Sequence, residues 1–301
     1  MLRRLSLVTG VDAGMFSQLL LLGGSLRRYS PGLALHVCDF GLTEAQRAYV
    51  RRRHVLLHKP PEIRARHSWD YKANLGRYVA ALSCDASVWI DADMIVLRDI
   101  EAPLQALFQA MRADGHVVAA ADSGVNIGVH QALEPAPSYA MLVSGFDPSA
   151  PYLNSGFFLC AARGFLDVWA AQTAIMHFEK LYEQNAFNLT VLGSRRQVRI
   201  LDRFRWNLVA NDLPSANIEV SPGHVAITGP AGPALMLHAT STHRSRDLVQ
   251  QAMEIEVNGR PVTTSVRMIR NPPALLSFQH ELTVEAIRRE AAALVECGVW
   301  P

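Results

Sequence analysis

The sequence has few cysteines, no CxxC pair and no long apolar run. Its 301 residues include four cysteines, at 38, 84, 160 and 297, and none has a histidine-rich neighbourhood. This spacing argues against structural zinc and against a disulfide framework. No apolar stretch approaches the ~20 residues that span a bilayer, and the apolar run after the basic start is too short for a signal peptide. We therefore expect a cytoplasmic protein with no integral membrane segment.

An excess of charge of one sign is also missing. The chain has 29 Lys and Arg against 27 Asp and Glu, and only three of the basic residues are lysines, at 59, 72 and 180. A net charge of +2 gives no electrostatic case for a nucleic-acid partner or an anionic membrane. Half of the residues are apolar, so the chain can bury a large core in one domain or in two closely fused ones.

Strand-like and helix-like segments alternate through the first half, which is typical of an α/β protein with a mainly parallel central sheet and helices on both faces. We expect strands at 5–8, 33–38, 55–57, 87–91, 117–121 and 155–160. We expect helices at 14–29, from the cap Thr43 to about 52, at 70–82 and at 163–179. Residues 122–151 are rich in turn formers and are interpreted as an excursion beside a site rather than a linker.

The C-terminal segment has a different pattern. Asn258-Gly259 separates two strand-like runs, 254–257 and 260–267, and Asn-Gly favours a hairpin turn. An amphipathic helix is expected at about 283–296, ending at Gly298. We expect this helix to pack on the core rather than to attach to a membrane. The sequence thus predicts a nucleotide-binding and catalytic unit over 1–250, with a hairpin and helix over 251–301 packed on it.

Two aspartates, Asp91 and Asp93, come directly after the apolar run Val88–Ile90. In an extended segment residues i and i+2 project to the same face, so both carboxylates can point at one spot. The carboxyl ends of strands are where open α/β sheets bind ligands. With fourteen aspartates in the chain, roughly one Asp-x-Asp is expected by chance. The position of the two aspartates after a buried strand is therefore the stronger evidence. It favours a site for a divalent cation that already carries a phosphate.

Seven segments, in order along the chain, resemble motifs of one family: retaining glycosyltransferases of the GT-A fold, of the glycogenin and lipopolysaccharide galactosyltransferase type (glycosyltransferase family 8). The segments are Leu7–Asp12, Tyr29–Pro31, Cys38–Thr43, Trp89–Asp93 (the family's DxD), Tyr152–Phe158 (its YxNSG), Glu183–Asn188 (its DQDxLN) and Leu235–His238. Each motif alone is weak, but together they cover about residues 5–245. The resemblance implies a Rossmann-like nucleotide-diphospho-sugar transferase fold.

The resemblance also implies an activity. It predicts a hexosyltransferase that moves a hexose from a UDP-sugar to a carbohydrate or other glycan acceptor, with retention of configuration. Asp91, Asp93 and His238 would hold Mn²⁺ or Mg²⁺ against the donor diphosphate. A single histidine at a strand end is more often structural, and the family match reverses that preference here. An imidazole ligand favours Mn²⁺, because Mg²⁺ prefers oxygen ligands alone.

Further donor-binding residues follow from the resemblance. Thr9 and Asp12 lie in the nucleotide-binding turn, where Asp12 can accept a hydrogen bond from a uracil imide; a plain turn aspartate is the alternative. Ala92 belongs to the DxD segment itself. Arg77 matches a family arginine that reaches the donor, and a surface salt bridge is the competing interpretation. Lys72, on the same expected helix, is named only as possible.

Arg244 departs from the family pattern HxxGxxK, in which a lysine holds the diphosphate. Arginine keeps the charge and adds a bidentate fork, so the role can persist. Ser241 replaces the glycine of that motif, which puts close backbone approach to the phosphates in doubt.

The sugar-binding part of the site is implied by the YxNSG and DQDxLN segments. Asn154, Ser155 and Gly156 would line the floor under the donor sugar, with Gly156 leaving room for the ring; an ordinary strand entry is the alternative. Glu183 and Gln184 stand where the family has its catalytic, sugar-contacting residues. Asn185 replaces the second aspartate of the motif and removes a charge. Retention requires no enzyme base, because the leaving phosphate can take the acceptor proton, so no nucleophile is assigned.

Other interpretations stay open at this stage. A non-catalytic UDP-sugar-binding protein on the same fold is consistent with Asn185 and Ser241. A haloacid-dehalogenase-type phosphatase would use Asp91 as nucleophile and Asp93 as acid/base, but it needs a later pair of metal-binding carboxylates and no Asp-Asp occurs downstream. A dinucleotide oxidoreductase is disfavoured, since the turn after the first strand lacks the G-x-G-x-x-G spacing.

Overall fold

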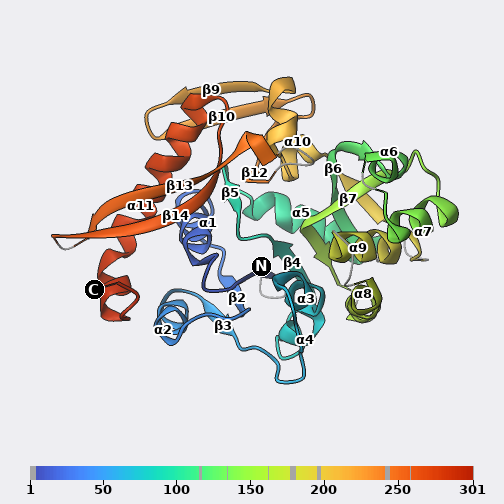
Figure 1. Cartoon of the computed structure of the whole chain (residues 1–301), viewed down its shortest axis with the longest axis horizontal. Coiled ribbons are helices and arrows are strands. Elements are labelled where there is room, and N and C mark those ends of the chain that lie inside the picture. The colour runs from blue at the N-terminus through green and yellow to red at the C-terminus, as the bar shows by residue number, and fades with distance from the viewer. Residues whose placement is uncertain are drawn as a thin grey trace.

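The protein folds around a seven-stranded sheet that has helices on both faces (Figure 1). The computed structural model describes residues 5–114, 117–133, 135–161, 163–176, 181–194, 198–240, 245–257 and 259–300. The strands of the main sheet run in the order β3-β2-β1-β4-β7-β6-β8. Neighbouring strands are parallel except where β7 pairs antiparallel with β4 and β6. The predicted α/β class with a mainly parallel sheet is confirmed.

The strands are β1 (Leu5–Val11), β2 (Leu35–Asp39), β3 (Val55–Leu57), β4 (Ala86–Ile90), β5 (Met94–Val96), β6 (Val117–Asn126), β7 (Pro151–Cys160), β8 (Val198–Leu201), β9 (Asn217–Ser221), β10 (His224–Gly229), β11 (Gly232–Pro233), β12 (Met236–His238), β13 (Leu248–Val257) and β14 (Arg260–Ile269). The helices are α1 (Phe16–Tyr29), α2 (Glu44–Arg53), α3 (Ser68–Ala73), α4 (Leu75–Val79), α5 (Glu101–Asp114), α6 (Ile127–Leu133), α7 (Pro137–Gly145), α8 (Arg163–Met176), α9 (Tyr182–Leu192), α10 (Arg203–Trp206) and α11 (Pro273–Glu296), with short 3₁₀ turns at Ala210–Ser215 and Ser245–Asp247.

Alternate residues of the central strands feed two separate apolar cores. On one side, Val88 and Ile90 pack with the apolar face of α1 and with α11. On the other, Val8 and Trp89 pack with residues of α8 and α9. Successive strand residues point to opposite faces of a sheet, so a continuous apolar run is what a strand covered on both faces requires. The strand that delivers the aspartates is therefore fixed from both sides.

A small second sheet crosses the end of β4. Strand β5 follows the Asp-x-Asp turn and pairs antiparallel with β12, with Met94 opposite His238. The backbone N–H of Ala239 also donates to the carbonyl of Asp93, at 2.8 Å. This register places a residue from the last quarter of the chain beside the aspartate pair.

The helix expected at 70–82 is two short helices, α3 and α4, separated at Asn74. The Asn74 side-chain amide donates to the carbonyl of Asp70 at 2.8 Å, which is a local alternative to continuing the helix. The helix Glu44–Arg53 is confirmed with its predicted cap, since Thr43 accepts from the backbone of Gln46 and Gln46 bonds back to Thr43.

The excursion at 122–151 contains more regular structure than its turn-rich composition indicated. Strand β6 continues to Asn126, and helices α6 and α7 follow before β7 begins. Phe146 and Tyr152 help to form a small third core there. The segment is a helical lobe that packs at the start of β7.

The C-terminal hairpin and helix are both longer than predicted. The hairpin begins at Leu248, so the predicted boundary after residue 250 falls inside β13, and the division into two units stays a prediction. Helix α11 begins at Pro273, a residue type favoured at the first helical position. Figure 1 shows β13 and β14 lying beside α11 and α1, and the same elements share one apolar core. Across the described residues no helix is long and apolar enough to cross a membrane.

Candidate active site

Asp91, Asp93 and His238 meet at the carboxyl end of β4. Their candidate ligand atoms all lie within 4.8 Å of one another. The Nε2 atom of His238 is 3.1 Å from Oδ1 of Asp93 and 3.8 Å from Oδ2 of Asp91. Metal–ligand bonds to carboxylate and imidazole are about 2.0 to 2.2 Å long, so these separations suit neighbouring ligands of one ion. The donor set therefore fits a divalent cation, and the pairing of β5 with β12 explains how it forms.

His238 is held in the orientation that such a ligand needs. Its Nδ1 lies 2.8 Å from the side-chain oxygen of Asn207, an acceptor, so Nδ1–H donates and Nε2 keeps its lone pair toward the aspartates. The ring also fills the space above Gly156, where a Cβ would come within 2.5 Å of the imidazole. Gly156 thus makes room for His238, whereas the expectation was that it makes room for the sugar ring.

Electrostatics couples His238 and Asp93. Burial alone would lower the pKa of His238, but the two aspartates outweigh burial and the pKa is raised. Burial would raise the pKa of Asp93, but the charges of His238 and of Arg267 outweigh it and the pKa is lowered. The attraction between the two side chains thus opposes the effect of burial on both pKa values.

Lys72 is the buried cation of this site. Its Nζ lies 3.0 Å from Asp91, donates to the hydroxyl of Ser155 at 3.0 Å, and is 3.8 Å from Glu183. Trp89 donates its indole N–H to Asp91 at 2.6 Å, so the orientation of that carboxylate is fixed by two donors. Burial would lower the pKa of Lys72, but Asp91 and Glu183 outweigh it and the pKa is raised. Lys72 was named from the sequence only as a possible site residue, and in the structure it contacts Asp91, Ser155 and Glu183 together.

Glu183 and Gln184 line up behind Ser155 at the start of α9. One oxygen of Glu183 accepts from the Ser155 hydroxyl at 3.2 Å, and the other has no hydrogen-bond partner among the described residues. Burial raises the pKa of Glu183 to about 7, with Lys72 offsetting part of the effect. Gln184 accepts from the backbone of Ser155 at 3.3 Å and donates to Asp122 at 3.0 Å. Asn154 is occupied within its own strand, accepting from the N–H of Gly156 at 2.7 Å.

A cavity of about 320 Å³ opens beside this cluster. Its walls come from the β1 turn, α3, the Asp-x-Asp turn and β14, and include Gly10, Val11, Asp12, Met15, Phe40, His67, Ser68, Trp69, Lys72, Trp89, Asp91, Ala92, Asp93 and Arg267. Asp12 also accepts from the backbone N–H of Met15 at 3.0 Å, so it is a turn aspartate and a cavity residue at once. The volume lies in the range of small-ligand sites.

Among the predicted donor-binding residues that the structure describes, Thr9 and Arg77 do not line this cavity, and neither do Asn154, Ser155 and Gly156. Arg77 is exposed on α4 and lies 3.6 Å from Glu62, which matches the competing surface-salt-bridge interpretation. Lys72 and Arg77 stand on different helices, α3 and α4, on either side of the break at Asn74. Thr9 is completely buried within β1. Arg244, with Ser241, lies outside the described residues.

Two residues of the site were missed by the sequence analysis, and one departure from the family pattern is explained. Asn207 and Arg267 reach the cluster through long-range pairing, and neither stands in a motif with its own signal. Asn185 is fully buried, accepts from the hydroxyl of Tyr152 at 2.5 Å and donates to Ser138 at 2.7 Å. Its amide ties β7 to α7.

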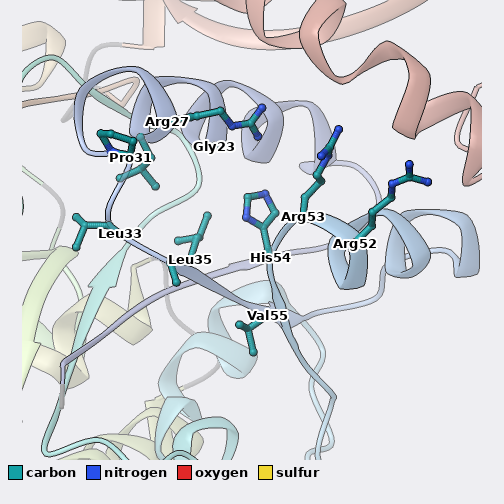
Figure 2. Close-up of a pocket in the computed structure, with 11 residues that line it drawn as sticks. Gly23, Arg27, Pro31, Leu33, Leu35, Arg52, Arg53, His54 and Val55 are labelled. Atoms are coloured by element: carbon teal, nitrogen blue, oxygen red, sulfur yellow. The ribbon is translucent and has the colours of Figure 1, made fainter. Parts of the chain in front are cut away.

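A second cavity, of about 390 Å³, lies at the amino ends of β2 and β3, whereas Asp91 follows the carboxyl end of β4. Figure 2 shows Arg27, Arg52, Arg53 and His54 around it. The arginines pair with glutamates of α11: Arg27 and Arg53 with Glu290, and Arg52 with Glu296. Because ligands of open α/β sheets bind outside the carboxyl ends of the strands, the smaller cavity is the candidate active site.

Of the comparisons with known proteins, the one with solved structures finds similar architectures. No protein-family model matches the chain, and no curated protein matches it in sequence. Among solved structures, it is similar to the galactosyltransferase LgtC in complex with donor and acceptor sugar analogues, at 17% identity and a TM-score of 0.53, covering 77% of this chain and 86% of that one. An active-site mutant of LgtC matches with a TM-score of 0.52.

The apo structure of the bifunctional glycosyltransferase WbbM is similar at 13% identity and a TM-score of 0.54, covering 79% of this chain and 46% of that one. At these identities the matches establish the fold. The predicted resemblance to LgtC-type enzymes is confirmed at that level: this chain has the GT-A fold of nucleotide-sugar glycosyltransferases.

Proposed function

We propose that the protein is a metal-dependent glycosyltransferase that moves a hexose from a UDP-sugar to a carbohydrate or other glycan acceptor with retention of configuration. The observation that carries the proposal is the meeting of Asp91, Asp93 and His238 beside a ligand-sized cavity at the carboxyl end of β4. The similarity to LgtC, solved with donor and acceptor sugar analogues, supports a sugar nucleotide as the ligand.

The two aspartates and His238 would hold the cation, with Asn207 fixing the imidazole. A bound Mn²⁺ or Mg²⁺ would supply Lewis-acid stabilisation to the departing diphosphate. The imidazole in the donor set favours Mn²⁺. Asp12, which lines the cavity, would accept a hydrogen bond from the uracil imide. Ala92, between the two aspartates in the chain, also lines the cavity.

The buried polar cluster behind the aspartates suits the sugar. Lys72 binds Asp91 and Ser155 and contributes a positive charge where a diphosphate would leave. The unpartnered oxygen of Glu183 would accept a hydrogen bond from a sugar hydroxyl. A buried carboxylate oxygen without a donor is costly, and a bound sugar would remove that cost. Gln184 is oriented by Ser155 and Asp122, and Asn154 and Gly156 set the path of the strand beside it. The leaving phosphate would take the acceptor proton, so no enzyme base is required.

A non-catalytic UDP-sugar-binding protein is the rival function. Asn185 was one reason to consider it, but that amide bonds Tyr152 and Ser138 and does not line the cavity. A phosphatase using Asp91 as nucleophile is disfavoured, because the matching solved structures are glycosyltransferases. A cytoplasmic location is also part of the proposal, and it agrees with four cysteines that form no disulfide bond.

The first test is a thermal-shift screen of UDP-sugars with Mn²⁺, followed by assay of UDP release and of the anomeric configuration of the product by NMR. Asp93→Asn and His238→Ala each remove one ligand, and we expect roughly 100-fold or greater loss of Mn²⁺-dependent activity. Asp167→Asn and His224→Ala, both exposed, are the matched controls and should retain activity.

Unchanged activity in either ligand variant would contradict the metal assignment. Mn²⁺-dependent UDP binding by the unmodified protein, with no transfer and no hydrolysis of any UDP-sugar, would identify the rival binding function instead.

A further inference from the structure

Arg267 brings a second cation to the aspartate pair from outside the region that resembles the family. It stands on β14, and its guanidinium Nη1 is 3.2 Å from Oδ2 of Asp93. The side chain is 41% exposed and lines the cavity. Asp91 and Asp93 are thus each paired with one permanent cation, Lys72 in the interior and Arg267 at the cavity wall.

The position of Arg267 is fixed by the helix that begins at the cavity. Its backbone N–H donates to the side chain of Gln18 at 2.7 Å, and the Gln18 amide donates back to the Arg267 carbonyl at 3.4 Å. Gln18 is buried on α1, and Ser17 on the same helix bonds Thr264 of β14 at 2.6 Å. The hairpin is therefore anchored to α1 immediately beside the guanidinium, so that little ordering is needed when a ligand arrives.

The charge and shape of the guanidinium suit a phosphate better than a lone carboxylate. An arginine carries five N–H donors in a planar fork, more than a single carboxylate oxygen requires. Arginine binds phosphate oxygens in bidentate fashion. A divalent cation held by Asp91, Asp93 and His238 would bring a diphosphate to the same edge of the cavity, within the surroundings of this side chain.

We propose that Arg267 binds the diphosphate of the nucleotide donor, so that the C-terminal hairpin completes the donor site. The inference rests on the proposed function, because it takes a nucleoside diphosphate as the ligand. It assigns the hairpin a role in binding in addition to its packing on α1 and α11.

A purely structural salt bridge and a diphosphate-binding residue predict different effects on the binding of a nucleoside diphosphate. Beside Asp93, a positive charge opposes a divalent cation, so its removal should leave Mn²⁺ affinity unchanged or higher. The same removal should weaken binding of the diphosphate, which loses charge-assisted hydrogen bonds. The affinity for uridine, which carries no phosphate, should not change.

The experiment measures binding of Mn²⁺ alone, and of UDP and uridine in saturating Mn²⁺, by calorimetry on the full chain. For Arg267→Ala we expect UDP affinity to fall about 10- to 100-fold, with Mn²⁺ affinity equal or higher and uridine affinity unchanged. The UDP affinity of Arg267→Lys should lie between those of Arg267→Ala and the unmodified protein, since lysine keeps the charge and lacks the planar fork of N–H donors. Arg260→Ala, which removes the same charge from the exposed other end of β14, is the matched control.

Equal UDP affinity in Arg267→Ala and the unmodified protein would overturn the inference and leave the proposed function intact. A parallel loss of Mn²⁺ and uridine affinity would also overturn it, because that pattern indicates damage to the site as a whole. Failure of the unmodified protein to bind UDP with any divalent cation would instead count against the proposed function. Urea unfolding of each variant shows whether the hairpin stays folded.

Discussion

Two glutamates that are equally buried respond to their surroundings in opposite ways. Glu183, in the candidate active site, and Glu290, behind the larger cavity, are each 3% exposed. Burial raises the pKa of Glu183 to about 7, and Lys72 cancels only part of that effect. For Glu290 burial also acts to raise the pKa, but the guanidinium groups of Arg27 and Arg53 outweigh it and the pKa is lowered.

The contrast separates a structural ion pair from a site prepared for a ligand. Glu290 joins α11 to α1 and to the end of α2, and its two arginines compensate its charge. In the candidate site Lys72 is shared between Asp91 and Glu183, and Arg267 pairs with Asp93, so three carboxylates face two permanent cations. A comparison of these two cavities by volume alone would favour the one beside Glu290, at the wrong end of the sheet. The balance of charge and the direction of the strands select the other end.

The largest effect is expected when the shared cation is removed. Lys72→Met keeps most of the length of the side chain but leaves the buried Glu183 and the partly exposed Asp91 without their partner. Breaking a buried ion pair on one side costs about 3 to 5 kcal/mol, so we expect that decrease in the free energy of unfolding, measured by urea denaturation without metal. Mn²⁺ should stabilise this variant more than it stabilises the unmodified protein, because it restores positive charge beside Asp91.

A loss of less than 1 kcal/mol for Lys72→Met would contradict the shared-cation description of the site. Lys59→Met is the matched control, since Lys59 is an exposed lysine whose ammonium bonds Tyr71 at the surface.

The second effect is a pH dependence of opposite sign at the two glutamates. Glu183 has its folded-state pKa raised from 4.5 to about 7, so its contribution to stability is complete below pH 4.5 and is lost as the pH rises through 7. Glu183→Gln removes this titration. The unfolding free energy of the unmodified protein, minus that of Glu183→Gln, should therefore fall by on the order of 3 kcal/mol between pH 4.5 and pH 8.

Urea denaturation across that range measures the difference. A difference that is constant with pH would show that Glu183 is ionised throughout and is as well neutralised as Glu290.

The elements that follow from local sequence were predicted well, and the reason is physical. Strand β4 has no polar side chain after Ser87 because both of its faces are covered, and the Thr43 cap acts within four residues. The break at Asn74 was missed, since an amide can continue a helix or bond back to the carbonyl of Asp70 with little difference in local signal. The turn-rich segment 122–151 forms helices α6 and α7 through packing with Tyr152, which composition does not report.

The site was predictable in its motifs but not in its long-range partners. The Asp-x-Asp turn and His238 could be named because each ends an apolar strand, and the resemblance joined them. Asn207 and Arg267 enter through the register of β12 and the anchoring of β14 on α1, and neither pairing is written in local sequence. The sequence analysis preferred Arg77 to Lys72, whereas the structure places Lys72 at the Asp91 carboxylate and Arg77 beside Glu62 at the surface.

The smallest effect tests the structural end of the comparison. Glu290 has a lowered pKa in the folded state, so its stabilising contribution is present above its unfolded pKa and is lost as the pH falls. Its arginines are about one-third exposed, and solvent screening limits their contribution. Glu290→Gln should therefore lower the free energy of unfolding by about 1 to 2 kcal/mol at pH 7, and the difference should shrink in acid.

Glu285→Gln, on the same helix but 43% exposed and paired with Arg28 and Arg289, should cost less than about 0.5 kcal/mol. Both variants should bind UDP with Mn²⁺ as tightly as the unmodified protein, as measured by calorimetry, because neither side chain reaches the cavity beside Asp91. A weakened UDP affinity in Glu290→Gln alone would mean that the two ends of the sheet are coupled through α1. The ion pairs of Glu290 beside the larger cavity would then influence the donor site, in addition to joining α11 to α1 and α2.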